Sequence, residues 1–289
     1  MSAEFLLKQL PGGEFSMRSV NIGETFHPVI GARREAENLY LAQFNVSGRC
    51  ARAGAPLTVW DVGLGAAGNA MHLIECWACQ PQRDLRLVSF DLDDRALRFA
   101  LKAHAEDETK FPWLAGWDWE KILREQGGRF TVSGRQLCWE WRLADFPGLL
   151  ADPSVSWSAA PELIFYDAYS PAKCWRMWTL THWRNVRRRC PDDCEIAFHS
   201  RATALRVTLL LAGFYVGRGV AIGEKEETTV AATRRTLLRR PLDEMWLRRV
   251  RRSTSAEPYT GGQYTQSSIS AGHLAALSAH PQFQSAGWN

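Results

Sequence analysis

A glycine-rich segment between two apolar runs constrains the fold of this chain more than any other feature. Residues 63–69 (GLGAAGN) have Gly-x-Gly-x-x-Gly spacing and follow the β-rich apolar run 57–60. Helix formers at helical spacing come next, and a second apolar run, 85–90, ends in Asp91. This order predicts a strand–loop–helix–strand unit that binds a nucleotide, with the acid accepting hydrogen bonds from ribose hydroxyls. The cofactor-binding residues predicted in this unit are Gly63, Gly65, Gly68, Asn69 and Asp91.

Three acidic residues at the ends of predicted strands indicate which nucleotide binds. Asp61 precedes the glycines at the strand tip, Asp91 ends the next strand, and Asp145 follows the alternating run 135–143. Dinucleotide sites place a pyrophosphate at the helix N-terminus, which a carboxylate at Asp61 would repel. The sulfonium and ammonium of S-adenosylmethionine (SAM) suit this carboxylate, so we expect SAM, with Asp145 at the adenine amino group and Phe146 against the ring. The alternative is that each acid only caps the helix that follows it.

Length and composition limit the class of protein. A chain of 289 residues with 46% hydrophobic residues can bury the core of one large α/β domain or at most two domains. No apolar run has membrane-spanning length and no signal-peptide pattern is present, so we expect a cytoplasmic protein with no membrane partner. Seven scattered cysteines argue against a disulfide framework. Two cysteine pairs, 76/79 and 190/194, lack a histidine at zinc-finger spacing, so we expect no metal.

The net charge of +4 is small but unevenly distributed. Eight arginines and only two acids lie between Arg234 and Arg252, and four more arginines lie within 184–189, on a predicted helix. Such clusters are either solvated faces or surfaces that bind phosphate backbones.

The alternation of strands and helices predicts an α/β, doubly wound, Rossmann-like sheet with an antiparallel final hairpin. We expect three parts: an N-terminal extension (1–56) with a pair of short strands and a helix at 34–43, a cofactor-binding domain (57–240), and a basic, then Ser/Gly-rich tail (241–289). Further strands are predicted at 162–166 and 194–199, helices at 181–189 and 203–212, and the hairpin at 213–216 and 228–233. The aromatic segment 111–119 is either a lid or substrate wall, or a satellite hydrophobic cluster. Residues 253–270 have the composition of a mobile tail, and 273–277 can dock back.

A loop after the strand at 162–166 carries the most specific family resemblance. Residues 167–178 (DAYSPAKCWRMW) resemble the methyltransferase domain of the bifunctional tRNA wobble-uridine modification enzymes of the MnmC family. That family shows Asp-x-Phe-Ala/Ser-Pro-x-Lys-x-Pro-x-Met-Trp here, and Tyr169 replaces the phenylalanine with another ring. The matching residues are Asp167, Pro171, Lys173, Met177 and Trp178.

The resemblance extends over roughly residues 20–235, with departures. The segments 23–27 (GETFH), 62–69 and 212–214 are also similar to the family, as is the closing segment Gly223-x-Lys225-x-Glu227. Cys174-Trp175 replaces the usual Asn-Pro, and the closing segment lacks one arginine. The FAD-dependent oxidase half is absent from this sequence, so we expect a stand-alone methyltransferase.

The resemblance implies a class I SAM-dependent methyltransferase that methylates the primary amine of 5-aminomethyl(-2-thio)uridine at the tRNA wobble position, with the anticodon loop as its partner. Asp167 is expected to accept a hydrogen bond or proton from that amine. Its alternatives are a helix cap or a contact to the SAM amino group. Tyr169 is expected to stack on the uracil or line the methyl channel. The implied substrate-binding residues are Ser170, Pro171, Lys173, Trp178 and Lys225.

Two other functions stay open at this point. The altered Cys174-Trp175 and the missing arginine leave room for a SAM methyltransferase acting on another amine, in a small molecule or a protein. The third alternative is a degenerate SAM-binding module that contacts RNA without catalysis. The four acids Asp61, Asp91, Asp145 and Asp167 argue against that module.

Overall fold

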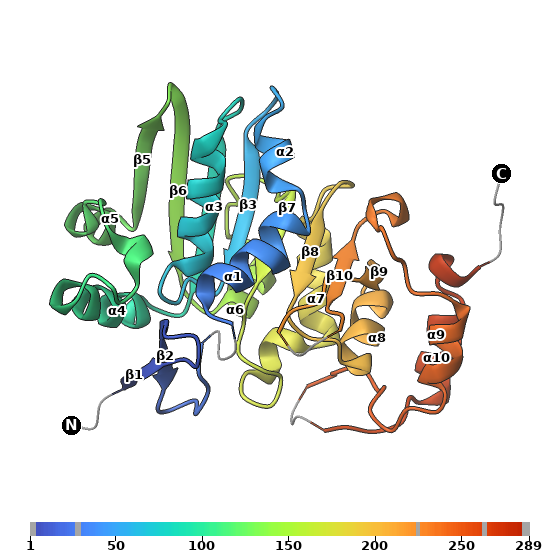
Figure 1. The fold of residues 1–289 in the computed structure, drawn as a ribbon. Coiled ribbons are helices and arrows are strands. Elements are labelled where there is room, and N and C mark those ends of the chain that lie inside the picture. The colour runs from blue at the N-terminus through green and yellow to red at the C-terminus, as the bar shows by residue number, and fades with distance from the viewer. Residues whose placement is uncertain (1–3, 27–29, 224–225, 262–264, 285–289) are drawn as a thin grey trace. The chain divides into compact units, whose positions relative to one another are not determined.

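The computed structural model describes residues 4–26, 30–223, 226–261 and 265–284 (Figure 1). The chain divides into two compact units. Unit 1 comprises Met1–Phe146, Leu163–Asp167 and Ala221–Glu226, and unit 2 comprises Pro147–Glu162, Ala168–Val220 and Glu227–Asn289. Within the described residues, no helix is long and apolar enough to cross a membrane and no cluster of side chains could hold a metal ion. The predicted boundaries after residues 56 and 240 stay a prediction.

The main sheet of unit 1 has five strands among the described residues, in the order β5-β6-β4-β3-β7. The four parallel strands are β3 (Leu57–Val62), β4 (Leu85–Asp91), β6 (Arg135–Leu143) and β7 (Leu163–Tyr166). Every residue of β3 and β7 is buried, as expected for parallel strands covered on both faces. The predicted strand–glycine loop–helix–strand unit is therefore confirmed.

The remaining strand of this sheet was not expected from the sequence. β5 (Gly127–Val132) pairs antiparallel with β6 at the sheet edge. Its sequence, GGRFTV, begins with two glycines and has only two large apolar residues. It therefore lacks the apolar run by which the parallel strands are predicted.

Helices and a small hairpin surround the unit 1 sheet. The hairpin of β1 (Phe5–Gln9) and β2 (Phe15–Ser19) confirms the predicted pair of short strands. The predicted helix at 34–43 is divided into α1 (Ala32–Ala36) and the π-helix η1 (Glu37–Ala42). The other helices of unit 1 are α2 (Val46–Cys50), α3 (Gly68–Cys79), α4 (Arg95–Glu106), η2 (Pro112–Leu114) and α5 (Trp119–Glu125). The helix α6 (Phe146–Ala151) begins at the last residue of this part of unit 1, and its other residues belong to unit 2.

Unit 2 contains three antiparallel strands in the order β8-β10-β9. They are β8 (Glu195–Phe198), β9 (Tyr215–Arg218) and β10 (Thr229–Ala232), which confirms the predicted closing hairpin. Its helices are η3 (Trp175–Trp178), α7 (Leu180–Arg189), α8 (Thr203–Leu211), η4 (Arg235–Leu237), α9 (Glu244–Val250), α10 (Ala271–Ser278) and η5 (Pro281–Phe283).

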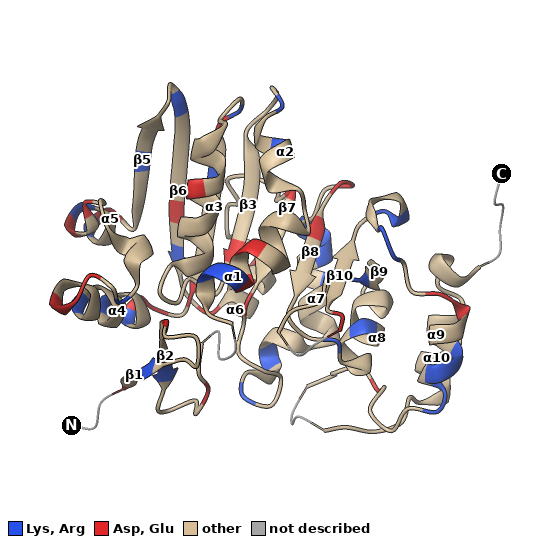
Figure 2. Ribbon diagram, viewed as in Figure 1, with Lys and Arg blue, Asp and Glu red and all other residues tan. Residues whose placement is uncertain are grey.

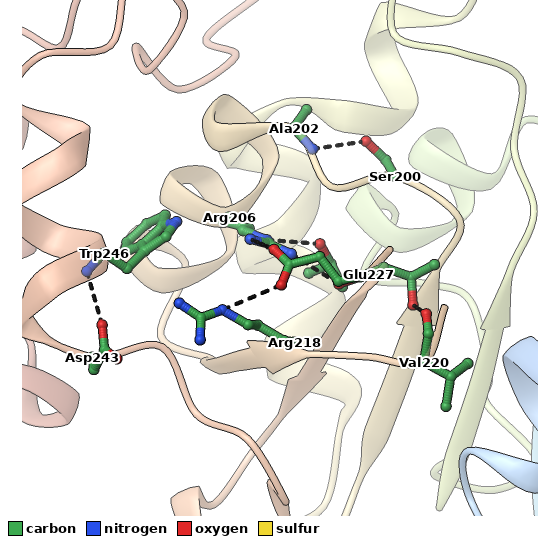
Figure 3. Close-up of polar contacts among 10 residues, drawn as sticks. Ser200, Ala202, Arg206, Arg218, Val220, Glu227, Asp243 and Trp246 are labelled. Carbon is green, nitrogen blue, oxygen red and sulfur yellow. Dashed lines mark hydrogen bonds and ion pairs between the residues drawn. The ribbon is translucent and has the colours of Figure 1, made fainter. Parts of the chain in front are cut away.

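A partly buried ion-pair cluster fixes the closing hairpin of unit 2 (Figure 3). Arg206, only 3% exposed on α8, donates to Glu227 Oε1 at 2.8 Å and to Thr229 Oγ1 at 3.0 Å. Arg218 on β9 lies 3.3 Å from Glu227 Oε2. Because one carboxylate joins two guanidinium groups, both ends of the hairpin loop are held to α8.

Part of the C-terminal region differs from its sequence-based prediction. Ala256 is fully buried and Tyr259 is 8% exposed. Leu180 N–H donates to Tyr259 O at 2.6 Å, and Tyr259 N–H donates to Thr208 Oγ1 at 3.2 Å. The prediction of a mobile tail is therefore wrong for residues 256–259, where packing outweighs polar composition. The docking segment is confirmed, because Leu277 on α10 is fully buried.

Candidate cofactor and acceptor site

The glycine loop has a backbone conformation that only glycine adopts easily. Gly63 has φ of 107° and Gly65 has φ of 51°, and both Gly63 N–H and Leu64 N–H donate to Phe90 O, at 2.9 and 3.1 Å. A Cβ on Gly63 would lie 2.8 Å from the carbonyl oxygen of Asp167. The loop therefore passes β7 so closely that a side chain at Gly63 is excluded. α3 begins at Gly68, directly after this loop.

Asp91 is held in a fixed orientation at the end of β4. Its Oδ2 accepts from Gly65 N–H at 2.9 Å and its Oδ1 accepts from Leu92 N–H at 2.7 Å. Burial raises the pKa of the Asp91 carboxyl to about 6, although these two hydrogen bonds oppose the shift. Each carboxylate oxygen has a second lone pair, so the group can still accept from the two hydroxyls of a ribose.

Asp61 lies one residue inside β3 rather than at its tip, because the strand continues to Val62. Its side chain is fully buried, and Oδ2 accepts from Ser89 Oγ at 2.8 Å. Ser89 Oγ in turn accepts from Trp139 Nε1 at 3.0 Å. Ser89 and Trp139 are two polar partners that the sequence analysis missed, since they become neighbours only when β3, β4 and β6 pair.

The end of β6 lies beside Asp91. Ala144 N–H donates to Asp91 O at 2.8 Å, which places the partly exposed Asp145 next to the end of β4. Phe146 is 4% exposed, and its ring centroid lies 4.6 Å from that of Phe90 and 6.2 Å from that of Trp60. This ring packs in the core beneath the strand ends, and its contact with an adenine stays a prediction.

A hydrogen bond joins the glycine loop to the first residue after β7. Asn69 Nδ2 donates to Asp167 Oδ2 at 3.0 Å, and Asp167 N–H donates to Val62 O at 2.9 Å. The two residues are 98 positions apart in the chain. The structure therefore brings together a predicted cofactor residue, Asn69, and the predicted acceptor residue, Asp167, within unit 1.

Two aromatic residues near this site were not selected from the sequence. Trp113, within the aromatic segment 111–119, donates from Nε1 to Ala66 O of the glycine loop at 2.9 Å. Phe111 and Leu114 of the same segment are buried, so it is packed onto unit 1 as well as in contact with the loop. The segment therefore packs as a satellite hydrophobic cluster, and its role as a lid or substrate wall stays a prediction.

Tyr40 is the second of these residues and lies on η1. It is 1% exposed, and its ring stacks on Phe165 of β7 with centroids 4.4 Å apart. Burial raises the pKa of Tyr40 well above its usual value, and the carboxylates of Asp167, Glu35 and Asp61 raise it further. No local pattern distinguishes Tyr40 in the sequence, because its neighbours come from other elements.

The rest of the predicted acceptor loop belongs to unit 2. Ser170 O accepts from the N–H groups of Lys173 and Cys174, both at 2.9 Å, and Tyr169 O accepts from Trp178 Nε1 at 2.8 Å. Trp178 is buried and anchors the turn, Pro171 is partly exposed, and Lys173 is exposed to solvent. Lys225 and His27 lie outside the described residues.

These residues fit SAM by their chemistry. The segment 61–69 contains one acid, Asp61, and no lysine or arginine, so its charge disfavours a pyrophosphate and favours a cationic cofactor. The carboxylates of Asp61, Asp91 and Asp145 can accept hydrogen bonds, and their assignment to a cationic group, a ribose and an adenine amino group stays a prediction.

Comparisons with known proteins agree with this chemistry. Residues 153–234 match the model of an S-adenosyl-L-methionine-dependent methyltransferase family, Methyltransf_30. The chain is 27% identical over 218 residues to the tRNA 5-methylaminomethyl-2-thiouridine biosynthesis bifunctional protein MnmC of Methylibium petroleiphilum, covering 72% of this chain and 32% of that protein. It is 27% identical over 236 residues to the MnmC protein of Ralstonia nicotianae, covering 78% of this chain and 34% of that protein.

A solved structure supports the fold. The crystal structure of MNMC2 from Aquifex aeolicus superposes with a TM-score of 0.67 at 19% identity, covering 96% of this chain and 83% of that one. This chain spans about a third of the length of the curated relatives that it matches. The expected Rossmann-like fold and the SAM cofactor are thereby confirmed. The chain is a SAM-dependent methyltransferase with a Rossmann-like α/β fold, and its sequence is similar to about a third of the length of the MnmC proteins.

Proposed function

We propose that this protein methylates the primary amine of 5-aminomethyl(-2-thio)uridine at the wobble position of tRNA. The observation that carries the proposal is the contact between Asn69 and Asp167, which ties the acceptor residue to the cofactor loop. The names of the relatives support it, because those proteins take part in the biosynthesis of 5-methylaminomethyl-2-thiouridine in tRNA. A cytoplasmic location is part of this proposal.

Bound SAM supplies the methyl group, and the residues of this chain align and deprotonate the acceptor. An alkylamine is mostly protonated at pH 7, and only its neutral form has the lone pair that attacks carbon. In this proposal Asp167 takes the proton, with its carboxylate oriented by the hydrogen bond from Asn69. The glycine loop and Asp61 hold the cofactor, Asp91 its ribose and Asp145 its adenine. Tyr169 stacks on the extruded uracil, and Ser170, Pro171, Lys173, Trp178 and Lys225 contact the nucleotide.

The arginines of unit 2 support a tRNA partner (Figure 2). Segment 234–252 carries eight arginines and two acids in a chain whose total net charge is only +4. Five of its arginines are exposed and make no ion pair with any described residue: Arg239, Arg240, Arg249, Arg251 and Arg252. Arg248 has one long contact, 3.8 Å, with Glu244. Uncompensated arginines at this density favour binding to a phosphate backbone.

The test is transfer of labelled methyl from SAM to tRNA that lacks this methyl group, followed by nucleoside analysis. We expect labelled 5-methylaminomethyluridine with the wild type and with Asp152→Ala, which removes an exposed acid from a surface turn of unit 2. Asp167→Ala should give none. SAM binding without any labelled nucleoside would reject tRNA as the substrate and assign the enzyme to another amine, in a small molecule or a protein.

A further inference from the structure

Two buried polar atoms near the end of β7 have no hydrogen-bond partner among the described residues: one belongs to a residue stacked on Phe165, the other to a residue that donates to Asp167. They are the hydroxyl oxygen of Tyr40 and Oδ1 of Asn69. Tyr40 is 1% and Asn69 is 4% exposed. Burying a polar atom without a partner costs free energy, so two such atoms at the same end of β7 indicate a group that binds there.

The orientation of the Asn69 amide follows from its neighbour. Asn69 Nδ2 lies 3.0 Å from Asp167 Oδ2, and an ionised carboxylate can only accept. The nitrogen must therefore face Asp167, which leaves Oδ1 as the atom without a partner. Oδ1 is an acceptor, so the missing group is a donor.

The position of the Tyr40 hydroxyl is fixed by packing of its ring. The ring is stacked on Phe165 at an interplanar angle of 18°, and Phe44 stacks on the same Phe165 with centroids 6.2 Å apart. Tyr40 lies on the π-helix η1, whose wider turn is frequent at functional sites. The phenol stays protonated at neutral pH, because burial and the nearby carboxylates raise its pKa.

The negative charges near Tyr40 indicate what kind of donor binds there. Asp167, Glu35 and Asp61 are the carboxylates whose charges act on Tyr40. These charges disfavour an anion and favour a group that is positive or carries N–H donors. We propose that the Tyr40 hydroxyl and Asn69 Oδ1 bind an amine beside Asp167. This inference rests on the proposed role of Asp167 as the amine-binding residue.

The amine has two sources: the α-amino group of SAM, or the acceptor amine on the nucleoside. Tyr40→Phe removes the hydroxyl and keeps the ring, and Tyr215→Phe on β9 is the matched control. Calorimetric titration of each protein with SAM and with 5′-methylthioadenosine, which lacks the amino acid part, separates the sources. If the amine is that of SAM, Tyr40→Phe should lower the affinity for SAM about tenfold and leave the affinity for 5′-methylthioadenosine unchanged. If it is the acceptor amine, SAM affinity should hold while kcat/KM for tRNA falls about tenfold.

Stability provides a second readout. Because the hydroxyl has no described partner, Tyr40→Phe should leave the Tm of the protein without ligand unchanged or raise it. A lower Tm, or equal loss of SAM and 5′-methylthioadenosine binding, would mean a structural role and overturn the inference. Unchanged SAM affinity together with unchanged kcat/KM would also overturn it. If the wild type proves inactive on tRNA, the proposed function fails separately, and unchanged SAM affinity alone then rejects the amine site.

Discussion

Two regions of this protein use charged and polar groups in different ways: the strand ends of unit 1 and segment 234–252 of unit 2. In unit 1 the polar groups are buried and joined to one another, as in the chain from Trp139 through Ser89 to Asp61. In unit 2 the arginines of 234–252 are largely exposed and uncompensated. Fixed, buried acceptors suit a small ligand that needs defined geometry, whereas exposed arginines suit a large polyanion. Variants of unit 1 should therefore change SAM binding or chemistry, and variants of unit 2 should change salt-dependent tRNA binding.

The largest expected effect is on chemistry in unit 1. Asp167→Asn keeps the size of the side chain but removes the proton acceptor, so kcat should fall by about 10²–10⁴-fold. SAM affinity should stay within about threefold, since the ribose and adenine contacts are unaffected. Single-turnover methyl transfer and calorimetry measure the two quantities. A comparable loss of SAM affinity would assign Asp167 to the cofactor instead of the acceptor.

The next effect tests the close approach of the glycine loop to β7. Gly63→Ala places a Cβ 2.8 Å from Asp167 O at a φ of 107°, so SAM affinity should fall at least tenfold and the free energy of unfolding by about 1–3 kcal/mol. Gly116→Ala is the matched control, because Gly116 also has positive φ, 80°, but has no atom within 4 Å of its Cβ. It should lose stability and keep SAM affinity. Equal SAM affinities for the two variants would show that the close contact between Gly63 and Asp167 does not affect cofactor binding.

A smaller effect is expected from unit 2. Replacing Arg249, Arg251 and Arg252 together with glutamine should weaken tRNA binding and reduce the slope of log K against log salt by about 2–3. SAM affinity should not change. The control replaces three exposed arginines of unit 1, Arg98, Arg124 and Arg129, in the same way. If the control reduces the slope equally, the binding is a general effect of net charge.

The smallest effect is a pH dependence through Asp91, whose pKa of about 6 is raised above its ordinary value. The carboxylate accepts from ribose more strongly than the acid does, so SAM affinity should fall as pH drops through 6, by about fourfold at pH 5.5. The stability of the protein without ligand changes in the opposite direction. Because the pKa of Asp91 is higher in the folded than in the unfolded state, the free energy of unfolding rises as pH falls through 6. Titration calorimetry from pH 7.5 to 5.5 measures the loss, and Asp91→Asn should remove it. If the SAM affinity of the wild type does not change with pH, Asp91 does not bind the ribose.

The sequence was sufficient to predict the parts of the fold that depend on local patterns. The strand β6 was predicted with its observed bounds, and the loop between β3 and α3 from its glycines. The edge strand β5 was missed because it has no apolar run. The tail prediction failed at Tyr259 because composition does not report tertiary packing.

The site shows the same division between local and long-range information. Asp91 and the glycines were selected from local order, and the structure places Gly65 N–H on the Asp91 carboxylate. The pairing of Asn69 with Asp167, and the stacking of Tyr40 on Phe165, join residues from distant parts of the chain. Such contacts follow from strand order and helix placement, which a single sequence does not specify. The assignment of each site residue to a role therefore stays a prediction.

A crystal structure with S-adenosylhomocysteine would test the central claim most directly, namely that the acidic strand ends of unit 1 bind the cofactor. We predict both ribose hydroxyls within hydrogen-bond distance of the Asp91 carboxylate and the adenine amino group at Asp145. A ligand bound in unit 1 without contact to Asp91, or bound elsewhere in the protein, would contradict the account.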